Sequence, residues 1–467
     1  MKNEVTALVD FGSTFTKVAL VELETGSLLA KGQAHTTIKT DVIEGYGRAL
    51  NQACDKISLD KKLVTPLAAS SAGGGLSVAA IGLVDDYTAT AARQAALNAG
   101  AKVDLVLSGR LNQTSIGVIT KLTPDILLFS GGTDGGQTHQ VLSNARKLAE
   151  FRFDIPIIIA CNSEISEQIS EILTESFSDI VITANVLPDI TKMNIEPARL
   201  AISRIFIEKV IMGKGLSQSN VFSQSVILPT PQAVLIAVEL LSKGTELSEG
   251  FGSVAAIDIG GATTDVHSSI IETDNLTKMN IRGVIYPPLK RSVQGDLGMR
   301  WSSKSAFEVD QDWIVETALR HKIARDELVK AINHRQINPS FLSTKIVDKK
   351  IDEILAISCA TLSIERHCGK AHAVYIPNQG IDMFQEGINL RELPLLIGTG
   401  GVLSHGEIGN MVMEAALERQ LKEALTPVSP QLIIDRDYVL AAAGILSISD
   451  KQAAFNLMRH NLLEMNL

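Results

Sequence analysis

The amino-acid sequence predicts an α/β protein with two similar lobes and a β/α insert. Short apolar runs end in glycine-rich turns and continue into helical patterns, which is typical of strands covered by helices. One pattern occurs near residue 10 and again near residue 258: a buried strand, then Asp, an apolar residue, Gly and small hydroxyl residues. The chain has 467 residues, 45% of them hydrophobic and 20% charged, which predicts two to four domains with sizeable cores.

The composition argues against several classes of protein. The net charge is −9 with acidic and basic residues well mixed, so we expect no basic face for nucleic acid. The most apolar runs are far too short to span a bilayer, and the N-terminal residues lack the apolar core of a signal peptide. We therefore expect neither nucleic-acid nor membrane partners. No C-x-x-C pair or disulfide framework occurs among Cys54, Cys161, Cys359 and Cys368, so we expect a cytoplasmic protein.

The first half of the chain predicts a β-hairpin and then a compact β/α unit. Residues 5–9 and 15–21 are expected to form the hairpin, with its turn at 11–14. Helices and strands then alternate through the predicted insert, residues 86–185. Its expected elements are helix 88–99, strands 103–107, 125–130, 155–160 and 179–183, and a helix that follows the glycine-rich turn 131–136.

The second half predicts a second hairpin and a largely helical segment. The expected elements are helices 195–212 and 232–241, a flexible linker at 244–252, strands 253–259 and 265–270, helices over 304–370, strand 395–397 and an Ala-rich helix at 438–446. The predicted domains are a first lobe (1–85 with 186–250), the insert (86–185), a second lobe (251–437) and a C-terminal connecting helix that returns to the first lobe (438–467).

The chemistry of the repeated pattern points to phosphate. A tight turn of Gly, Ser and Thr exposes backbone N–H groups that can ring a phosphate oxygen. Asp10 and Asp258 would repel phosphate by roughly 4 kcal/mol at 4 Å, so each is expected to hold Mg²⁺ through water. A mere strand turn is the alternative, and Lys17 could equally be a strand-edge lysine. The candidate phosphate contacts are Gly12, Ser13, Thr14, Thr16, Lys17, Gly260, Gly261, Ala262, Thr263 and Thr264.

These motifs resemble the ATPase fold shared by actin, sugar kinases and heat-shock chaperones. Residues 10–17 and 258–266 are similar to its two phosphate hairpins, 231–240 and 438–446 to its connecting segments, and 294–298 to a Gly-Asp-Leu-Gly loop. Its adenosine motif is matched by residues 395–402, with Gly398, Thr399, Gly400 and Gly401 as adenine contacts. The resemblance implies a two-lobed actin-like ATPase with ribonuclease H-like lobes, in which ATP or ADP is clamped between the Asp10 and Asp258 hairpins.

A narrower resemblance concerns the accessory protein of adenosylcobalamin-dependent glutamate mutase, a family called MutL or GlmL and unrelated to the mismatch-repair protein of the first name. It rests on GSTFTK (12–17), SSAGGGL (70–76), FSGGTDGG (129–136), DIGGATTDVHS (258–268) and KRSVQGDLGMR (290–300). It implies an ATP-binding, chaperone-like protein that reactivates a methylaspartate-type mutase or a related aminomutase. Thr230 stands where chaperones carry a water-positioning Glu, so we expect slow turnover or a hydrolytic residue elsewhere; with Asp10 and Asp258 it completes the candidate catalytic set.

Two other functions stay open at this point: a small-molecule kinase of the sugar and acetate kinase superfamily, and a filament-forming actin-like ATPase. The iron–sulfur activators of dehydratases share the hairpin but need cysteine ligands that this chain does not match. Three further motifs have a functional and a structural interpretation. FSGGTDGG is either an anion site or a tight turn. Cys368 and His372 would share a helix face and could be metal ligands, or the histidines, His367 among them, are simply packed. Lys290, Arg291 and Arg300 either line the nucleotide site or are solvated surface charges.

Overall fold

The computed structural model describes residues 4–72, 75–210, 217, 219–271, 279–377, 380–405 and 408–463. The chain divides into two compact units, each of which collects distant segments of the sequence. Unit 1 contains Met1–Ala237, Gly283–Lys290 and Ala441–Leu457; unit 2 contains Val238–Arg282, Arg291–Leu440 and Met458–Leu467.

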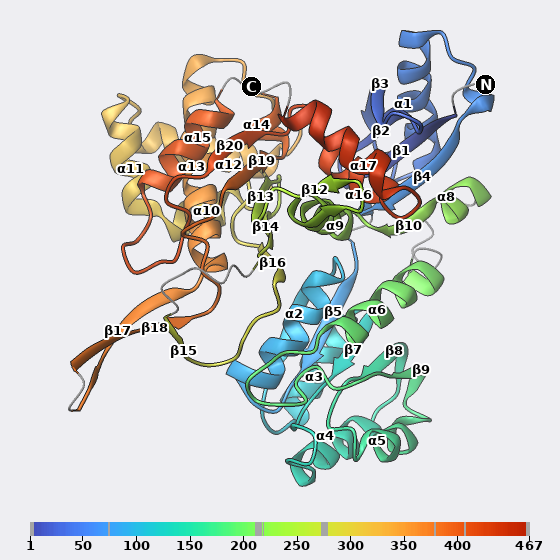
Figure 1. The fold of residues 1–467 in the computed structure, drawn as a ribbon, viewed down its shortest axis with the longest axis vertical. Helices are drawn as coiled ribbons and strands as arrows, with labels where there is room; N and C mark the ends of the chain where they lie inside the picture. Colours follow the sequence, from blue (N-terminus) through green and yellow to red (C-terminus); the bar gives the residue numbers. More distant parts are fainter. Residues whose placement is uncertain are drawn as a thin grey trace. The chain divides into compact units, whose positions relative to one another are not determined.

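The first sheet of unit 1 is built around the first predicted hairpin (Figure 1). Strands β1 (Val5–Phe11), β2 (Phe15–Glu22) and β3 (Ser27–His35) are antiparallel neighbours. Strand β4 (Thr65–Ser70) runs parallel to β1, and β10 (Val226–Pro229) runs parallel to β4. The spatial order is therefore β3-β2-β1-β4-β10, and helix α1 (Val42–Ile57) connects β3 to β4.

The central sheet of unit 2 repeats this topology. Its strands are β13 (Val254–Ile259), β14 (Thr264–Ser269), β16 (Leu289–Gln294), β19 (Leu395–Thr399) and β20 (Gln431–Ile434), in the order β16-β14-β13-β19-β20. As in unit 1, the first two strands form an antiparallel hairpin and the last two run parallel to the first. In both sheets the strands lie in the order third, second, first, fourth, fifth along the chain, which is the ribonuclease H-like order. The two-lobed α/β fold predicted from the sequence is thus confirmed.

The helices follow the same duplication. Helix α9 (Thr230–Lys243) comes directly after β10, and α16 (Val439–Leu446) comes shortly after β20. The long helix α13 (Ile346–His367) stands between the third and fourth strands of its sheet, as α1 does in unit 1. Before α13 the chain forms α10 (Ser303–Val309), α11 (Gln311–Arg320) and α12 (Arg325–Ile337), which agrees with the helical segment expected over 304–370.

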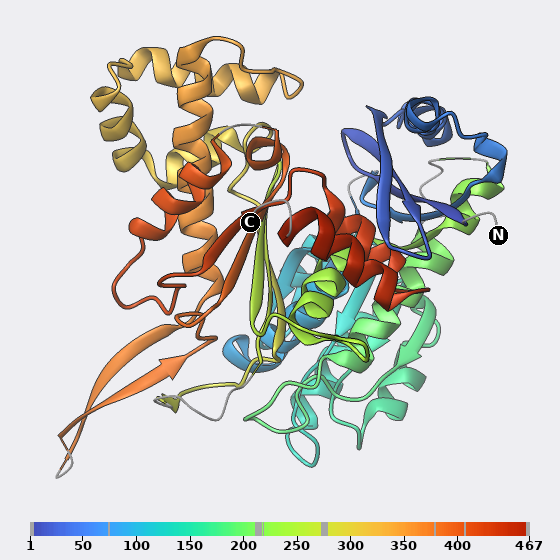
Figure 2. The same cartoon turned by 45° about the horizontal axis from the view of Figure 1, so that its top comes forward.

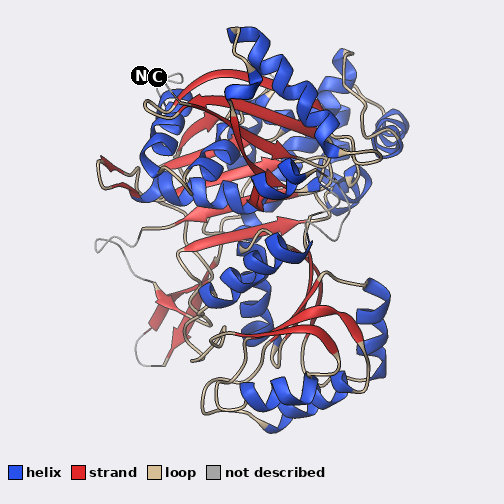
Figure 3. Cartoon of the chain, turned by 90° about the vertical axis from the view of Figure 1, so that its right-hand side faces the viewer, coloured by secondary structure: helices blue, strands red, loops and turns tan. Residues whose placement is uncertain are grey.

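The insert in unit 1 is a parallel sheet with helices on both faces (Figure 3). Its order is β6-β5-β7-β8-β9, from β5 (Ser77–Ile81), β6 (Lys102–Leu107), β7 (Ile126–Phe129), β8 (Phe153–Ile159) and β9 (Phe177–Ile182). Alternate residues of β7 face two buried apolar clusters, because successive strand side chains point to opposite faces. The sheet starts at Ser77, upstream of the predicted boundary at residue 86. Its helices are α2 (Thr90–Asn98), α3 (Gln113–Leu122), α4 (His139–Ala149), α5 (Ser166–Leu173) and α6 (Glu196–Ile205).

Two sequence predictions are wrong in detail. The stretch 244–252, expected to be a flexible linker, contains a short hairpin of β11 (Gly244–Thr245) and β12 (Ser248–Glu249). Helix α13 ends at His367, and β17 (Lys370–Ile376) begins three residues later, so Cys368 and His372 do not share a helix face. Strand β17 pairs with β18 (Gly380–Glu386) in a hairpin that extends away from the helices of unit 2 (Figure 2).

The strands and α-helices not yet named are short. They are β15 (Asn280–Ile281), α8 (Asn220–Ser225), α14 (Gly401–Ser404), α15 (Gly409–Glu418) and α17 (Lys451–Met458). Within the described residues, no helix combines the length and the apolar character needed to cross a membrane. Gly73 and Gly74 of the SSAGGGL motif, and the end of the helix predicted over 195–212, lie outside the described residues.

Candidate functional site

The first hairpin turn is closed by its own backbone. The amide of Gly12 donates to the carbonyl of Phe15 at 3.1 Å, and a Cβ on Gly12 would lie only 2.7 Å from that oxygen. Glycine is therefore required here by close backbone approach. The turn residues Ser13 and Thr14 are exposed, and within the described part of the chain their amides and hydroxyls donate to no other group. These donors are available to an anion.

Asp10 lies at the end of β1, at the base of this turn. Its register partner on β2 is Lys17, and the hydroxyl of Thr230, the first residue of α9, donates to its Oδ1 at 2.7 Å. Burial raises the pKa of the Asp10 carboxyl above its ordinary value, while the charge of Lys17 and the bond from Thr230 act in the opposite direction. The structure thus brings together three predicted residues, Asp10, Lys17 and Thr230, that come from distant parts of the sequence.

Thr16 supports the turn from within the protein. Its side chain is fully buried, and its hydroxyl lies 3.0 Å from that of Thr36. Because the Thr36 hydroxyl already donates to the carbonyl of Gly12 at 2.8 Å, Thr16 must be the donor to Thr36. The Thr16 hydroxyl therefore belongs to the scaffold of the turn and does not face a ligand.

The second hairpin has the same internal closure. The amide of Gly260 donates to the carbonyl of Thr263 at 2.9 Å, as Gly12 does to Phe15. Ala262 is exposed at the tip, whereas the hydroxyl of Thr264 is buried and donates to the carbonyl of Leu297 at 2.9 Å. Thr264, like Thr16, is thus a scaffold residue, because its donor is already used inside the protein.

The GDLGMR loop after β16 packs directly on this turn. The amides of Met299 and Arg300 donate to the carbonyls of Gly260 and Gly261 at 3.0 and 2.8 Å. A Cβ on Gly298 would lie 2.6 Å from the carbonyl carbon of Ala262, so only glycine allows the loop to approach this closely. The resemblance placed these two motifs in sequence order, and the structure puts them in contact.

The adenosine-like motif adjoins Asp258. Thr399 on β19 is the register partner of Asp258, and Gly400 has φ 93° and ψ 159°, a conformation essentially confined to glycine. A Cβ on Gly400 would lie 2.4 Å from the carbonyl oxygen of Ile259 and 2.7 Å from Oδ1 of Asp258. Thr399 is buried, with its hydroxyl 3.3 Å from Asp435, while Gly401 is exposed. The motif therefore offers backbone, not side chains, beside Asp258.

The charges opposite the two aspartates differ, which the sequence comparison of the hairpins did not reveal. Asp258 has Asp265 as its register partner, at the position that Lys17 occupies opposite Asp10. The cation comes instead from the neighbouring strand, because Arg291 donates to Oδ2 of Asp265 at 3.0 Å and both side chains are buried. Arg291 is thus part of a buried ion pair, not a solvated surface charge as one interpretation held.

The other motifs have structural partners. Asp134 of FSGGTDGG accepts hydrogen bonds from Ser163 and Asn185, and Asn185 also donates to Gly132, so this loop is a closed turn. His367 is buried between the hydroxyls of Ser268 and Ser292, at 2.8 and 2.7 Å. Among the described residues no group of three or more His, Cys, Asp or Glu could hold a metal ion. The packed-histidine interpretation is therefore the one that the geometry favours.

Comparison with known proteins decides the family. A family model described as MutL protein matches residues 6–462. "Protein MutL" of Clostridium tetanomorphum is 35% identical over 459 residues, which cover 98% of this chain and 99% of that protein. The chain belongs to the MutL family.

Solved structures resemble this MutL-family protein more loosely. Acetone carboxylase in its nucleotide-free form is 13% identical, with a TM-score of 0.39, over 95% of this chain and 70% of the other. The activator of 2-hydroxyisocaproyl-CoA dehydratase from Clostridium difficile with bound ADPNP is 9% identical, with a TM-score of 0.31, over 96% and 95%. Xylulose kinase from Bifidobacterium adolescentis is 11% identical, with a TM-score of 0.31, over 97% and 93%. We assign the fold of the MutL-family chain from the sheet topology that its two units share, and not from these matches.

Proposed function

We propose that this protein binds Mg-ATP through its two hairpins and hydrolyses it as an accessory protein that reactivates an adenosylcobalamin-dependent mutase. The observation that supports nucleotide binding is that the same hairpin turn occurs in both sheets. In both sheets an Asp is the second-last residue of the first strand, and a glycine amide then closes a short turn onto the carbonyl three residues later. Membership of the MutL family supports an accessory role, and the resemblance described above supplies the mutase.

Each hairpin residue then has a chemical role. The amides and hydroxyls of Ser13 and Thr14 donate to phosphate oxygens, and Lys17 adds positive charge. Thr230 orients Asp10 through its hydrogen bond, and it is not itself the base, because the oxygen of a neutral alcohol is only weakly basic. Asp10, whose pKa burial raises, is a better proton acceptor than an ordinary carboxylate and is the candidate base for the attacking water. The exposed backbone at Gly401 is the candidate contact for adenine.

The residues fit a magnesium ion only if it arrives with the nucleotide. Each hairpin supplies one carboxylate at its strand end, and no group of three or more potential ligands occurs among the described residues. Magnesium usually keeps several waters and is bound by one or two carboxylates together with substrate phosphates. Asp10 and Asp258 would hold it through those waters, and the ion would supply neutralisation of the phosphate charge.

Calorimetric and thermal-shift titrations with Mg-ATP and Mg-ADP test nucleotide binding first. At 100 times its dissociation constant a ligand should stabilise the wild type by about 2.7 kcal/mol. Asp258→Ala should lose this shift, whereas Asp326→Ala, at an exposed position of α12, should keep it. No shift with either nucleotide in the wild type would contradict the proposal.

The reactivation assay then tests the accessory role. A mutase inactivated by substrate turnover should recover only with this protein, ATP and free adenosylcobalamin together. Equal recovery with a non-hydrolysable ATP analogue would remove hydrolysis from the proposal. ATP consumption that rises with a sugar or a carboxylic acid alone would instead indicate a kinase, and ATP-dependent sedimentation would indicate a filament. We also propose a cytoplasmic setting, because all four cysteines are free thiols.

A further inference from the structure

Two arginines converge on one buried carboxylate in unit 2, close to the second hairpin. Oδ1 of Asp352, on α13, accepts from Nη1 of Arg300 at 3.2 Å and from Nε of Arg335 at 2.8 Å. Its Oδ2 accepts from Nη2 of Arg300 at 3.2 Å and from the hydroxyl of Ser343 at 2.6 Å. Arg335 is completely buried, and Asp352 is almost so. All four lone-pair positions of this carboxylate are therefore occupied.

The charges of the cluster balance only with a second carboxylate. Arg335 also donates to the carbonyl of Asp348 at 2.8 Å, and its guanidinium lies 3.6 Å from the carboxylate of that residue. Two guanidinium groups and two carboxylates thus share a small volume with little solvent. Removing the charge of Asp352 would leave two guanidinium groups facing one more distant carboxylate, which is strongly unfavourable for buried ions.

Arg300 connects this cluster to the hairpin turn. Its amide donates to the carbonyl of Gly261, and its Cβ and Cγ lie 3.5 and 3.7 Å from the Cβ position of that glycine. Its Nε donates to the carbonyl of Phe341, in the segment between α12 and α13, at 3.1 Å. One residue therefore touches the turn with its backbone and the Asp352 cluster with its side chain.

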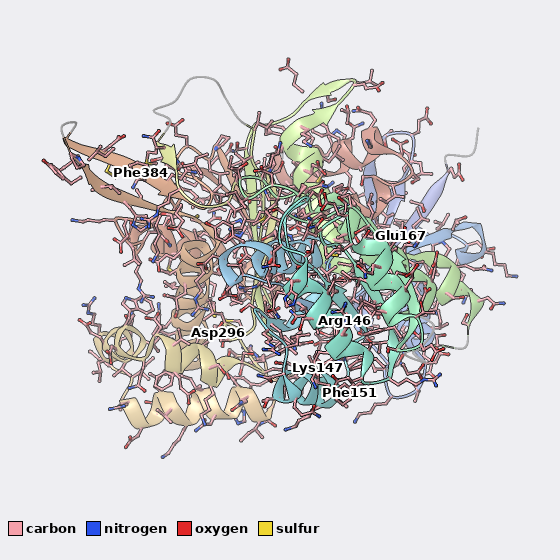
Figure 4. All side chains as sticks on the ribbon, turned by 90° about the horizontal axis from the view of Figure 1, so that it is seen from below. Arg146, Lys147, Phe151, Glu167, Asp296 and Phe384 are labelled. Atoms are coloured by element: carbon pink, nitrogen blue, oxygen red, sulfur yellow. The ribbon has the colours of Figure 1, made fainter. Side chains whose placement is uncertain are left out.

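The other end of the same loop is held by a second ion pair. Nη1 of Arg366, in the last turn of α13, contacts both carboxylate oxygens of Asp296 at 2.8 and 2.9 Å. Asp296 is labelled in Figure 4. Both side chains of this pair are more than one-third exposed, whereas those of Arg300 and Asp352 are largely buried. Exposed ion pairs contribute little to stability, so the Arg300–Asp352 pair holds the loop more firmly than the Arg366–Asp296 pair does.

We propose that Asp352 is a positioning residue for the second hairpin: it holds Arg300, and Arg300 fixes the turn Gly260–Thr263 in the shape that receives phosphate. The inference rests on the proposed nucleotide binding for its functional consequence and on the contacts above for its structural part. By linkage, a ligand that prefers the fixed turn must in return stabilise the Arg300–Asp352 pair. Nucleotide should therefore protect the segment 338–347, although it lies outside the hairpin.

Asp310 provides a matched control in the same unit. It too is a largely buried carboxylate paired with an arginine, since Arg419 contacts both of its oxygens and Ser358 donates to it. Within the described parts of the chain, neither Arg419 nor Ser358 forms a hydrogen bond to the hairpin turn. Asp352→Asn and Asp310→Asn each remove one largely buried negative charge that an arginine and a serine contact, so both variants should lose stability. Only the first should change the turn.

The experiment combines nucleotide titration with amide hydrogen exchange on the full chain. For Asp352→Asn we expect the dissociation constant of Mg-ATP to rise about tenfold, and the Met299 and Arg300 amides to exchange faster without nucleotide. Asp310→Asn should stay within about twofold of the wild type in affinity and keep the slow exchange. Arg300→Lys, which retains the charge and loses the bidentate geometry, should give an intermediate result and serves if Asp352→Asn does not fold.

Equal affinities and equal exchange in the Asp352→Asn and Asp310→Asn variants would overturn the inference. If the wild type itself fails to bind Mg-ATP, the proposed function is wrong, and the exchange measurement still decides the positioning role. Faster exchange of Met299 and Arg300 in Asp352→Asn alone would then retain that role, and unchanged exchange would remove it. Failure of nucleotide to protect residues 338–347 in a wild type that binds it would also count against the linkage.

Discussion

The hydroxyl of Thr230 donates a 2.7 Å hydrogen bond to Oδ1 of Asp10, across 220 positions of the sequence. It joins the first residue of α9 to the end of β1 at the base of the first turn. A hydroxyl that donates to a carboxylate orients it and favours its charged form. Thr230 therefore has a defined partner at the position where the resemblance led us to expect a water-positioning Glu.

Replacing Thr230 by Val tests this relationship. The variant keeps the shape of the side chain but loses the donor, so the pKa of Asp10 should rise further and the acidic limb of Mg-ATP binding should move to higher pH. A hydrogen bond to a charged group contributes about 1.5–3 kcal/mol, so affinity at neutral pH should fall about tenfold or more. Thr230→Ser should restore it in the same titration. Identical pH profiles for wild type and Thr230→Val would show that the bond does not control Asp10.

The raised pKa of Asp10 has a consequence for stability. A carboxyl whose pKa is higher in the folded than in the unfolded state destabilises the fold as pH rises from the unfolded value, about 3.8, through the folded one. Asp10→Asn should therefore raise the melting temperature of the ligand-free protein at pH 7, by about 2–4 °C per kcal/mol, and the gain should vanish below pH 4. Thermal unfolding across pH measures it. A melting temperature of Asp10→Asn below that of the wild type at pH 7 would contradict a raised pKa for Asp10.

Gly400→Ala should damage the second hairpin through Asp258. The new Cβ would meet the Ile259 carbonyl and the Asp258 carboxylate, in a backbone conformation that costs about 1–3 kcal/mol for other residues. We expect a lower melting temperature and a loss of nucleotide binding. Gly117→Ala, in α3, is the control, because among the described residues a Cβ there would have no neighbour within 4 Å outside its own helix, and Gly117 is not among the proposed nucleotide contacts. Similar effects of the two substitutions would rule out this explanation.

The hydroxyls of Thr14 and Thr16 should have opposite effects when removed. Thr14→Ala deletes an exposed donor, so nucleotide affinity should fall several-fold while stability stays within about 0.5 kcal/mol of the wild type. Thr16→Val deletes the buried bond to Thr36 and should cost about 1 kcal/mol of stability, with little change in affinity. Parallel melting and calorimetric titrations separate the two. If Thr16→Val loses nucleotide affinity but keeps the stability of the wild type, then the Thr16 hydroxyl contacts the ligand after all.

Native alkylation should distinguish the cysteines. Burial raises the pKa of the Cys161 and Cys359 thiols to about 12, so almost no thiolate exists at pH 8. Cys54 is buried with a raised pKa as well, whereas Cys368 is partly exposed. Brief treatment with iodoacetamide followed by peptide mass spectrometry should find Cys368 modified first. Earlier modification of Cys359 would mean that the core around α13 opens readily.

The sequence by itself determined the features that depend on neighbouring residues. The short apolar runs that end in Asp, an apolar residue and the glycines at 12 and 260 predicted both hairpins, since a turn and its two strands are specified locally. The strand–turn–helix alternation likewise predicted the insert, although not its start at Ser77.

Only the tertiary structure decided which distant residues contact one another. The bond from Thr230 to Asp10, the cation that Arg291 supplies to Asp265, and the attachment of Arg300 to Asp352 each join segments whose spacing has no periodicity. Such contacts depend on the order of strands in a sheet and on how a helix packs beside it. The sequence could therefore predict which residue types form the site. It could not predict which charged groups and hydrogen-bond donors contact those residues.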